Sequence, residues 1–361
     1  MLRQSSRTRA LTVELASHVQ IQHRDDVDLG RGNYQVCNDQ ITAELSYTFN
    51  MSVYVAGIKG MLGRSLKSEY EQANFEVFGS SSETVNFLDF DSTLKDFQKF
   101  RPSLLILAAA KVGGIGANLK YPVEYLAENI IIQTNILRAA HLAKIEKVVF
   151  IASSCIYPKH APIPIKEESL MTGPLEESNA PYSLAKLAGI KLTQSYRVEY
   201  GHDWISVLPT NLYGPYDNFN LENSHVLPSL MRKFQLATQE NRQTVEIWGD
   251  GTPSREFLHV NDLASAIRIA ADKYSSETPI NIGSQTEYSI REVVDILINI
   301  SNFRGEVLYD RNKPNGANRK QLDSSKIINL GWKPTIKLEQ GLKETYEWLN
   351  QSLANGGKIK L

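Results

Sequence analysis

The chain has 361 residues, of which 42% are hydrophobic and 22% charged, so it is long enough to bury a large core. Lys and Arg number 39 against 40 Asp and Glu, and this balance gives no overall field that would recruit nucleic acid or an acidic membrane. The two cysteines, Cys37 and Cys155, are too few for a disulfide framework or a zinc site. No apolar run approaches the ~18 residues of a membrane span. We therefore expect a soluble, cytoplasmic protein without a metal site.

The first fifty residues differ in composition from the rest of the chain. They hold five arginines and no lysine, whereas lysine recurs from Lys59 onward. The basic, hydroxyl-rich opening 3–9 has the composition of an organelle-targeting segment, but a complete catalytic domain begins near Met51. We therefore expect residues 1–50 to be a poorly ordered N-terminal extension without a chemical role.

From Ser52 onward, short apolar runs alternate with amphipathic segments of helical length. Such alternation is typical of a Rossmann-like, doubly wound parallel α/β sheet, in which strands covered on both faces are continuously apolar. The predicted strands are 53–56, 75–78, 104–108, 148–152 and 205–208. Beyond residue 215 longer loops precede a helix at 290–300. This pattern predicts a core over 51–215 and, over 216–361, mainly a smaller C-terminal α/β substrate lobe with some segments returning to the core.

A glycine-rich loop follows the first predicted strand directly. Three glycines at i, i+3 and i+6 let a chain turn sharply, approach a pyrophosphate and aim a helix N-terminus at it. The position between a strand and a helix therefore predicts a dinucleotide site rather than an incidental turn. The predicted cofactor contacts in this loop are Gly57, Ile58, Lys59, Gly60, Met61, Leu62 and Gly63.

The end of the second predicted strand indicates which dinucleotide is bound. NAD enzymes place Asp or Glu there to bind the ribose 2′-hydroxyl. This chain has three serines at 80–82, of which Ser81 is a predicted cofactor contact, and Lys59 lies in the glycine loop. Because no carboxylate in this run would repel a 2′-phosphate, the sequence favours NADP(H), although no arginine accompanies the serines.

A serine, a tyrosine and a lysine form the predicted catalytic set. Ser153 follows a predicted strand, and Tyr182 and Lys186 share one face of a predicted helix at i and i+4. Hydride delivery to a carbonyl requires a phenol to give up a proton, which an adjacent ammonium assists by lowering the pKa of the phenol. The serine hydroxyl holds the carbonyl oxygen. The combination resembles the extended short-chain dehydrogenase/reductase superfamily.

Five further segments make the resemblance more specific. Between about Met51 and Trp348 the chain is similar to the GDP-L-fucose synthase family at 111–116 (KVGGIG), 153–158 (SSCIYP), 209–215 (PTNLYGP), 223–226 (NSHV) and 248–259 (WGDGTPSREFLH). This resemblance implies 3,5-epimerisation of GDP-4-keto-6-deoxymannose followed by reduction at C4 with NADPH. It implies further cofactor contacts at Ile151, Ala152, Ser154, Lys186, Pro209, Thr210, Asn211, Leu212 and His225.

The same resemblance implies that Cys155 and His225 are the base and acid of epimerisation. A 4-keto group acidifies the protons at C3 and C5, so inversion needs one group to remove a proton and another to return one. Cysteine and histidine both titrate near neutral pH in suitable surroundings. The alternative for Cys155 is a small buried hydrophobe, and for His225 an ordinary loop histidine.

Four residues match substrate contacts of the family. They are Lys233, Trp248, Arg255 and Asn315. Lys233 stands where arginine is common in the family, which keeps the charge but loses bidentate geometry. Asn315 replaces an Asp often found there, which leaves guanine selectivity open. Trp248 could instead pack the lobe, and Arg255 could form a salt bridge between the lobes.

Three other functions use the same scaffold. A sibling nucleotide-sugar 4-epimerase would need only Ser153, Tyr182 and Lys186, and a dehydratase would carry an Asp/Glu pair beside the serine, where this chain has Ser154 and Cys155. A non-catalytic NADP sensor would be expected to have lost Tyr182 or Lys186. The superfamily commonly pairs through the helix that carries these two residues, so a homodimer is expected by resemblance.

Overall fold

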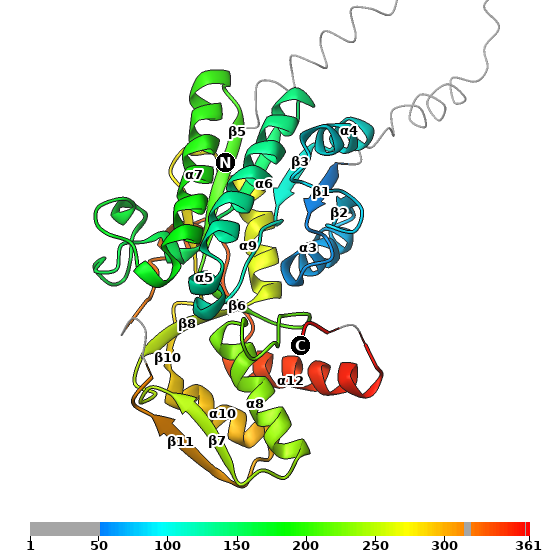
Figure 1. Cartoon of the computed structure of the whole chain (residues 1–361). Coiled ribbons are helices and arrows are strands. Elements are labelled where there is room, and N and C mark those ends of the chain that lie inside the picture. The colour runs from blue at the N-terminus through cyan, green and yellow to red at the C-terminus, as the bar shows by residue number, and fades with distance from the viewer. Residues whose placement is uncertain (1–50, 314–318, 358) are drawn as a thin grey trace, which may run out of the picture. The chain divides into compact units, whose positions relative to one another are not determined.

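The computed structural model describes residues 51–313, 319–357 and 359–361. These residues belong to a single compact unit (Figure 1). The predictions for residues 1–50 and for Asn315 lie outside the described residues.

A six-stranded parallel sheet forms the core, in the order β2-β1-β3-β4-β5-β9. The five strands predicted from apolar runs are all present, which confirms the predicted fold class. The order reverses between β1 and β3, and parallel sheets bind ligands in the crevice at such a reversal. The strands are β1 Ser52–Ala56, β2 Glu76–Ser80, β3 Leu104–Leu107, β4 Lys147–Ile151, β5 Asp203–Pro209 and β9 Ile280–Ile282.

Both faces of this sheet are covered by helices, as the doubly wound class requires. Side chains alternate along β1, so Tyr54 packs into the apolar cluster on one face and Val55 into the cluster on the other. The helices of this part are α3 Met61–Gln72, α4 Phe90–Phe100, α5 Ile115–Lys120, α6 Pro122–Leu142, α7 Ala180–Tyr200, α9 Val260–Lys273 and α11 Ser325–Asn329. Short 3₁₀ turns occupy Ser154–Ile156, Glu167–Ser169 and Glu177–Asn179.

A third apolar cluster lies around three helices late in the chain. These are α8 Val226–Gln239, α10 Ile290–Ser301 and α12 Leu338–Ala354. Two small sheets accompany them, with strands β6 Asn211–Tyr213, β7 Thr244–Trp248, β8 Ser254–His259, β10 Glu287–Ser289 and β11 Glu306–Asp310. The predicted helix at 290–300 is confirmed as α10, whereas the sequence reasoning missed α8, α9 and α12.

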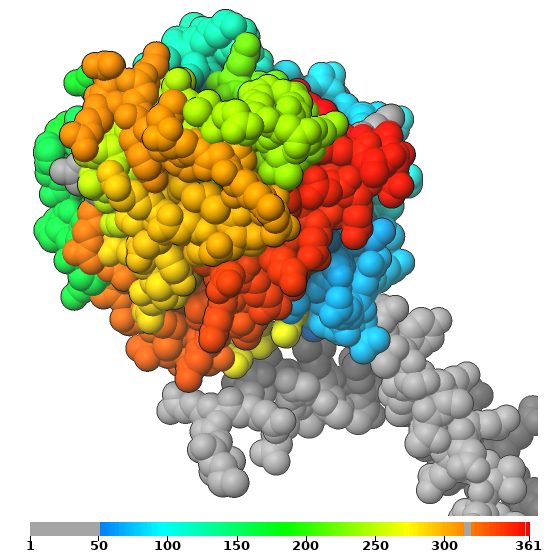
Figure 2. Space-filling model, turned by 90° about the horizontal axis from the view of Figure 1, so that it is seen from below, coloured from blue at the N-terminus to red at the C-terminus, as the bar shows by residue number. Residues whose placement is uncertain are grey.

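Helix α12 connects this late part of the chain to the first helix of the core. In Figure 2 the red residues of α12 lie between the yellow and orange residues near α10 and the blue residues of α3. The guanidinium of Arg64 in α3 lies 4.3 Å from the ring centroid of Tyr216, and that ring lies 4.6 Å from the ring of Trp348 in α12. A cation–π and aromatic stack therefore bridges the two parts.

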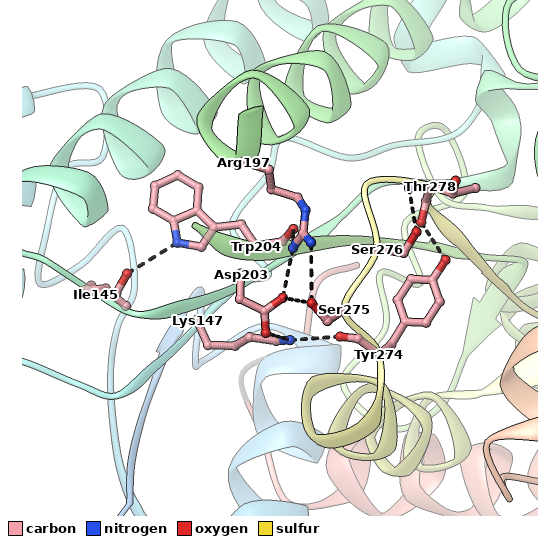
Figure 3. Close-up of polar contacts among 9 residues, drawn as sticks. All are labelled: Ile145, Lys147, Arg197, Asp203, Trp204, Tyr274, Ser275, Ser276 and Thr278. Atoms are coloured by element: carbon pink, nitrogen blue, oxygen red, sulfur yellow. Dashed lines mark hydrogen bonds and ion pairs between the residues drawn. The ribbon is translucent and has the colours of Figure 1, made fainter. Parts of the chain in front are cut away.

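At the amino ends of β4 and β5, away from the expected ligand edge, polar contacts hold the core together (Figure 3). The carboxylate of Asp203 accepts from Lys147 Nζ at 2.7 Å and from Arg197 at 2.9 Å. Lys147 also donates to the backbone oxygen of Tyr274 at 2.8 Å. These pairs join a strand, a helix and a loop, so we assign them a structural role.

The boundary expected between residues 215 and 216 stays a prediction. The core sheet takes its last strand, β9, from beyond that point. Among residues 51–313, 319–357 and 359–361, no helix is long and apolar enough to cross a membrane.

Candidate active site

The glycine loop folds as a tight turn between β1 and α3. Gly57 adopts a φ of +93°, which side-chain-bearing residues rarely adopt, and its N–H donates to the carbonyl of Ser80 at 2.8 Å. Gly63 lies in the first turn of α3, where a Cβ atom would come within 2.1 Å of the carbonyl oxygen of Gly57. Two of the three glycines are therefore required by geometry, as the motif predicts.

The N-terminus of α3 is suited to an anion. No side chain among the described residues caps it by hydrogen bonding, and its first turn, which contains Met61 and Leu62, holds no acid. The first N–H groups of a helix lack intrahelical partners and carry the positive end of the dipole. Together with the cradle between Gly57 and Gly63, this arrangement fits the pyrophosphate of a dinucleotide.

Just beyond the end of β2 the structure brings a carboxylate next to Lys59. Lys59 forms an ion pair with Glu83, and both side chains are largely exposed. The serine run itself holds no carboxylate, as the sequence analysis noted, but Glu83 just beyond it lies close enough to pair with Lys59. Ser81 is buried, and its hydroxyl accepts from the backbone N–H of Glu83 at 3.3 Å, which fixes the turn.

Helix α7 brings Tyr182 and Lys186 to the carboxyl end of β4. Lys186 is 3% exposed, and its Nζ donates to the backbone oxygen of Ile151 at 2.9 Å. The same Nζ lies 5.8 Å from the ring centroid of Tyr182. Ser153 follows β4 immediately, and its Oγ accepts from the N–H of Cys155 at 3.3 Å. The structure thus places the three predicted catalytic residues at the same edge of the sheet.

Burial is the largest influence on the pKa values of Tyr182 and Lys186. It lowers the pKa of Lys186 to about 8, an effect that the Cys155 thiol partly opposes. The pKa of Tyr182 is raised above its ordinary value, chiefly by burial and further by Cys155 and Tyr125. The ammonium of Lys186 donates to the carbonyl of Ile151, and the net shift of the Tyr182 pKa is opposite to the lowering expected from the sequence.

Cys155 is a half-buried free thiol in the turn that follows Ser153. The hydroxyl of Ser183 in α7 donates to its Sγ at 3.4 Å and to its backbone oxygen at 3.2 Å. Because Ser183 follows Tyr182 directly, this contact sets the thiol beside the first turn of α7. Cys155 therefore lies next to the three predicted catalytic residues.

His225 occupies the N-cap position of α8. His225 is exposed, and desolvation by the protein around it lowers its pKa. The loop before it touches the core, since the carbonyl of Asn223 accepts from the N–H of Gly114 at 2.8 Å. A Cβ atom at position 114 would lie 2.3 Å from the carbonyl oxygen of Ser224. Gly114 therefore permits the close approach that positions His225.

The remaining predicted cofactor contacts line the ends of the two central strands. Ala152 donates to the carbonyl of Val207 in β5 at 2.9 Å, which continues the pairing of β4 and β5 past Ile151. The other contacts either follow β4 in the 3₁₀ turn or lie where β5 leads into β6, and they are Ser154, Pro209, Thr210, Asn211 and Leu212.

Three of the four predicted substrate residues are described, and they come from the late part of the chain. Lys233 of α8 donates to the carbonyl of Glu246 in β7 at 2.8 Å. Trp248, at the end of the same strand, is 59% exposed, and the Nζ of Lys313 lies 5.4 Å from its ring centroid. Arg255 lies on β8, and burial lowers its pKa. An exposed indole beside cations suits a planar ligand with phosphates better than lobe packing.

Comparisons with known proteins agree with this geometry. The model of the NAD dependent epimerase/dehydratase family matches residues 53–283. The chain is 46% identical to a putative GDP-L-fucose synthase 2 of Arabidopsis thaliana over 302 residues, which cover 82% of this chain and 90% of that protein. The chain belongs to the GDP-L-fucose synthases of the NAD-dependent epimerase/dehydratase family.

Two further relatives of this family extend the likeness. The GDP-L-fucose synthase of Escherichia coli strain K12 is 43% identical over 306 residues, covering 82% of this chain and 95% of that protein. A crystal structure of a GDP-L-fucose synthetase from Naegleria fowleri bound to NADP superposes with a TM-score of 0.78 at 30% identity. That alignment covers 86% of this chain and 96% of the other. The family resemblance inferred from the motifs is confirmed.

The motifs did not reveal Lys320. Burial lowers the pKa of Lys320, and the nearby charge of Arg255 lowers it further, while Cys155 and Glu176 oppose the shift. Lys320 therefore lies within electrostatic reach of both a predicted proton-transfer residue and a predicted substrate residue. No spacing marks it, because it follows Arg319 in a polar run without a motif.

Sequence reasoning also missed Glu256, the residue that follows Arg255 in β8. Its side chain is 0% exposed, and its carboxylate accepts from the N–H of Gln285 at 2.6 Å and of Leu322 at 3.0 Å. Its backbone oxygen accepts from the side chain of Thr210 at 3.1 Å. Burial raises its pKa to about 7. Glu256 thus ties the segment that carries Lys320 to the predicted cofactor strand.

Proposed function

We propose that this protein converts GDP-4-keto-6-deoxymannose to GDP-L-fucose, by epimerisation at C3 and C5 and then reduction at C4 with NADPH. The observation that carries the proposal is the 46% identity to a GDP-L-fucose synthase over 302 residues, combined with a Ser, Tyr, Lys and Cys set at one sheet edge. The NADP-bound relative from Naegleria fowleri supports the cofactor.

The glycine loop and the end of β2 would hold the dinucleotide. The N–H groups at the start of α3 would bind the pyrophosphate, and Lys59 would bind the 2′-phosphate. NADPH, when bound, supplies the hydride for C4. The protein's task is to orient it against the sugar and to manage the protons.

Ser153 and Tyr182 would bind the C4 oxygen. Ser153 donates a hydrogen bond to this oxygen, and Tyr182 donates the proton that neutralises the developing alkoxide. The raised pKa of Tyr182 keeps the phenol protonated and ready to act as an acid. The charge of Lys186 stabilises the phenolate that results, and its pKa of about 8 leaves it charged at neutral pH.

Cys155 and His225 would transfer the protons of epimerisation. The C4 oxygen bound to Ser153 and Tyr182 carries enolate charge when a neighbouring proton is removed, so the same residues serve both reactions. The lowered pKa of His225 makes its neutral, basic form the majority at neutral pH. Each positioned proton transfer is typically worth ~10² to 10⁴ in rate.

The GDP part of the substrate would be held by the late part of the chain. Arg255 and Lys320 supply charge toward the diphosphate, and Trp248 offers an exposed face to the guanine. Lys233 lies on the neighbouring helix α8. We keep Asn315, outside the described residues, as a candidate contact with the base. Residues 51–215 and 216–361 would then act mainly as cofactor core and substrate lobe.

A homodimer in the cytoplasm is the second part of the proposal. Helices α6 and α7 present large apolar side chains to solvent, with Val198 77% and Leu184 50% exposed. Solvent exposure of apolar side chains on adjacent helices favours pairing with a second copy.

Loss of NADPH absorbance with GDP-4-keto-6-deoxymannose, with the sugar product identified, tests the reaction. We expect GDP-L-fucose and slower turnover with NADH. Cys155→Ser should stop exchange of the C3 and C5 protons with deuterium from the solvent while NADPH still binds. Exchange at the wild-type rate in that variant would remove Cys155 from the mechanism. Absence of oxidation with either cofactor would instead favour a sibling 4-epimerase, which recycles its cofactor.

A further inference from the structure

The ion pair between Lys59 and Glu83 lies where dinucleotide enzymes choose their cofactor. The N–H groups of Gly57 and Ile58 both donate to the carbonyl of Ser80, at 2.8 and 3.2 Å. These bonds fasten the glycine loop to the end of β2. The loop's lysine and the carboxylate three residues beyond β2 therefore face the same place, next to the adenosine ribose of a bound dinucleotide.

Three other polar side chains around this place, those of Ser80, Ser81 and Arg64, have partners of their own. The hydroxyl of Ser80 donates to Asp96 at 2.9 Å, and that of Ser81 accepts from the N–H of Glu83 at 3.3 Å. Arg64 donates to the carbonyl of Lys59 at 3.1 Å, and its guanidinium is stacked on Tyr216. Lys59 is therefore the cation best placed for a 2′-phosphate, and Glu83 is its partner.

We propose that Glu83 sets the preference of this protein between NADPH and NADH. Its carboxylate weakens NADPH binding in two ways, by holding the ammonium of Lys59 and by repelling the 2′-phosphate. With NADH the same carboxylate accepts a hydrogen bond from the ribose 2′-hydroxyl, the role that Asp or Glu has in NAD enzymes. This inference rests on the proposed function for its cofactor, but binding measurements test it without turnover.

The decisive variant is Glu83→Gln, which removes the charge and keeps the shape. Binding of NADPH and of NADH is titrated separately by calorimetry. We expect the Kd for NADPH to fall about 3- to 10-fold, the range for removing one unit of repulsion from an exposed phosphate. The Kd for NADH should stay constant or rise. Lys59→Met should weaken NADPH binding and leave NADH binding nearly unchanged.

Glu76→Gln is the matched control, because Glu76 is an exposed carboxylate at the opposite end of the same strand. It should leave both Kd values unchanged. The gain in NADPH affinity from Glu83→Gln should be smaller at about 500 mM salt than at about 50 mM salt, because salt screens exposed charges. An unchanged ratio of the two Kd values in Glu83→Gln, or an equal change in Glu76→Gln, overturns the inference. Failure of both cofactors to bind any variant or the parent would refute the cofactor proposal instead.

Discussion

Replacing Gly63 by alanine tests the phosphate loop most directly. The new Cβ atom would lie 2.1 Å from the carbonyl oxygen of Gly57, 2.7 Å from the Cα of Ile58 and 2.8 Å from the carbonyl carbon of Gly57. Ordinary contact needs about 3.5 Å, so the loop has to move by more than about 1 Å. All three atoms belong to the backbone of the loop, and no side chain can turn aside to relieve the clash.

We expect Gly63→Ala to cost about 1–3 kcal/mol of stability through overpacking. A shift of about 1 Å in groups that position a reaction typically costs ~10²-fold in rate, so turnover should fall by about that factor. NADPH binding should also weaken, because the displaced loop is the proposed pyrophosphate cradle. Calorimetric titration gives the affinity, and thermal unfolding gives the stability.

Gly60→Ala is the control for this prediction. A Cβ atom at position 60 would meet only the oxygen of Gly57, at 3.3 Å, and the φ of Gly60 is −70°, which any residue adopts. This variant should bind NADPH within a few-fold of the parent. Gly63→Ala binding NADPH as tightly as Gly60→Ala would refute the argument that the loop geometry requires glycine.

Two further predictions concern buried charges. Because burial lowers the pKa of Lys186 to about 8, its ammonium is lost as pH rises through that value, so the rate of C4 reduction should fall above about pH 8. Lys186→Met should be slow throughout and lack that fall in its pH profile. Glu256→Gln replaces by an amide the carboxylate that accepts from the Leu322 N–H. The KM for the GDP-sugar should therefore rise about 5-fold or more at pH 8, while the KM for NADPH changes little. Asp262→Asn, which alters a carboxylate that binds Thr335 instead, should leave the KM for the GDP-sugar unchanged.

The core was predictable because its strands are continuous apolar runs of strand length between breaks. Two of the helices that the sequence reasoning missed contain residues that usually interrupt or weaken a helix. Helix α8 has Pro228 at its third position, where a proline is tolerated although it looks like a break in sequence. Helix α12 contains Gly341, a poor helix former, because a Cβ atom there would lie 2.3 Å from the hydroxyl of Tyr213. Tertiary packing, which sequence periodicity does not contain, decides both helices.

The candidate site likewise contains residues that the sequence predicted and residues that it did not. The common location of Ser153, Tyr182 and Lys186 was predictable, because the proposed chemistry fixes both residue type and spacing along the chain. Glu83 and Lys320 were not, because each lies close to residues that are distant in sequence, Glu83 to Lys59 and Lys320 to Cys155 and Arg255. The direction of the Tyr182 pKa shift also depends on burial, which a motif does not report.

The glycine pair in the 111–116 motif lies against α6 on one side and against the loop that leads to His225 on the other. A Cβ atom at position 113 would lie 2.1 Å from the hydroxyl of Tyr125, a residue near enough to raise the pKa of Tyr182. A Cβ atom at position 114 would overlap the carbonyl of Ser224, the residue before His225. Gly114 therefore allows the loop before the proposed epimerisation acid to pack against the 111–116 segment, and Gly113 allows the same segment to pack against Tyr125 of α6. A side chain at either position would push these segments apart, so we expect both glycines to matter for the placement of His225.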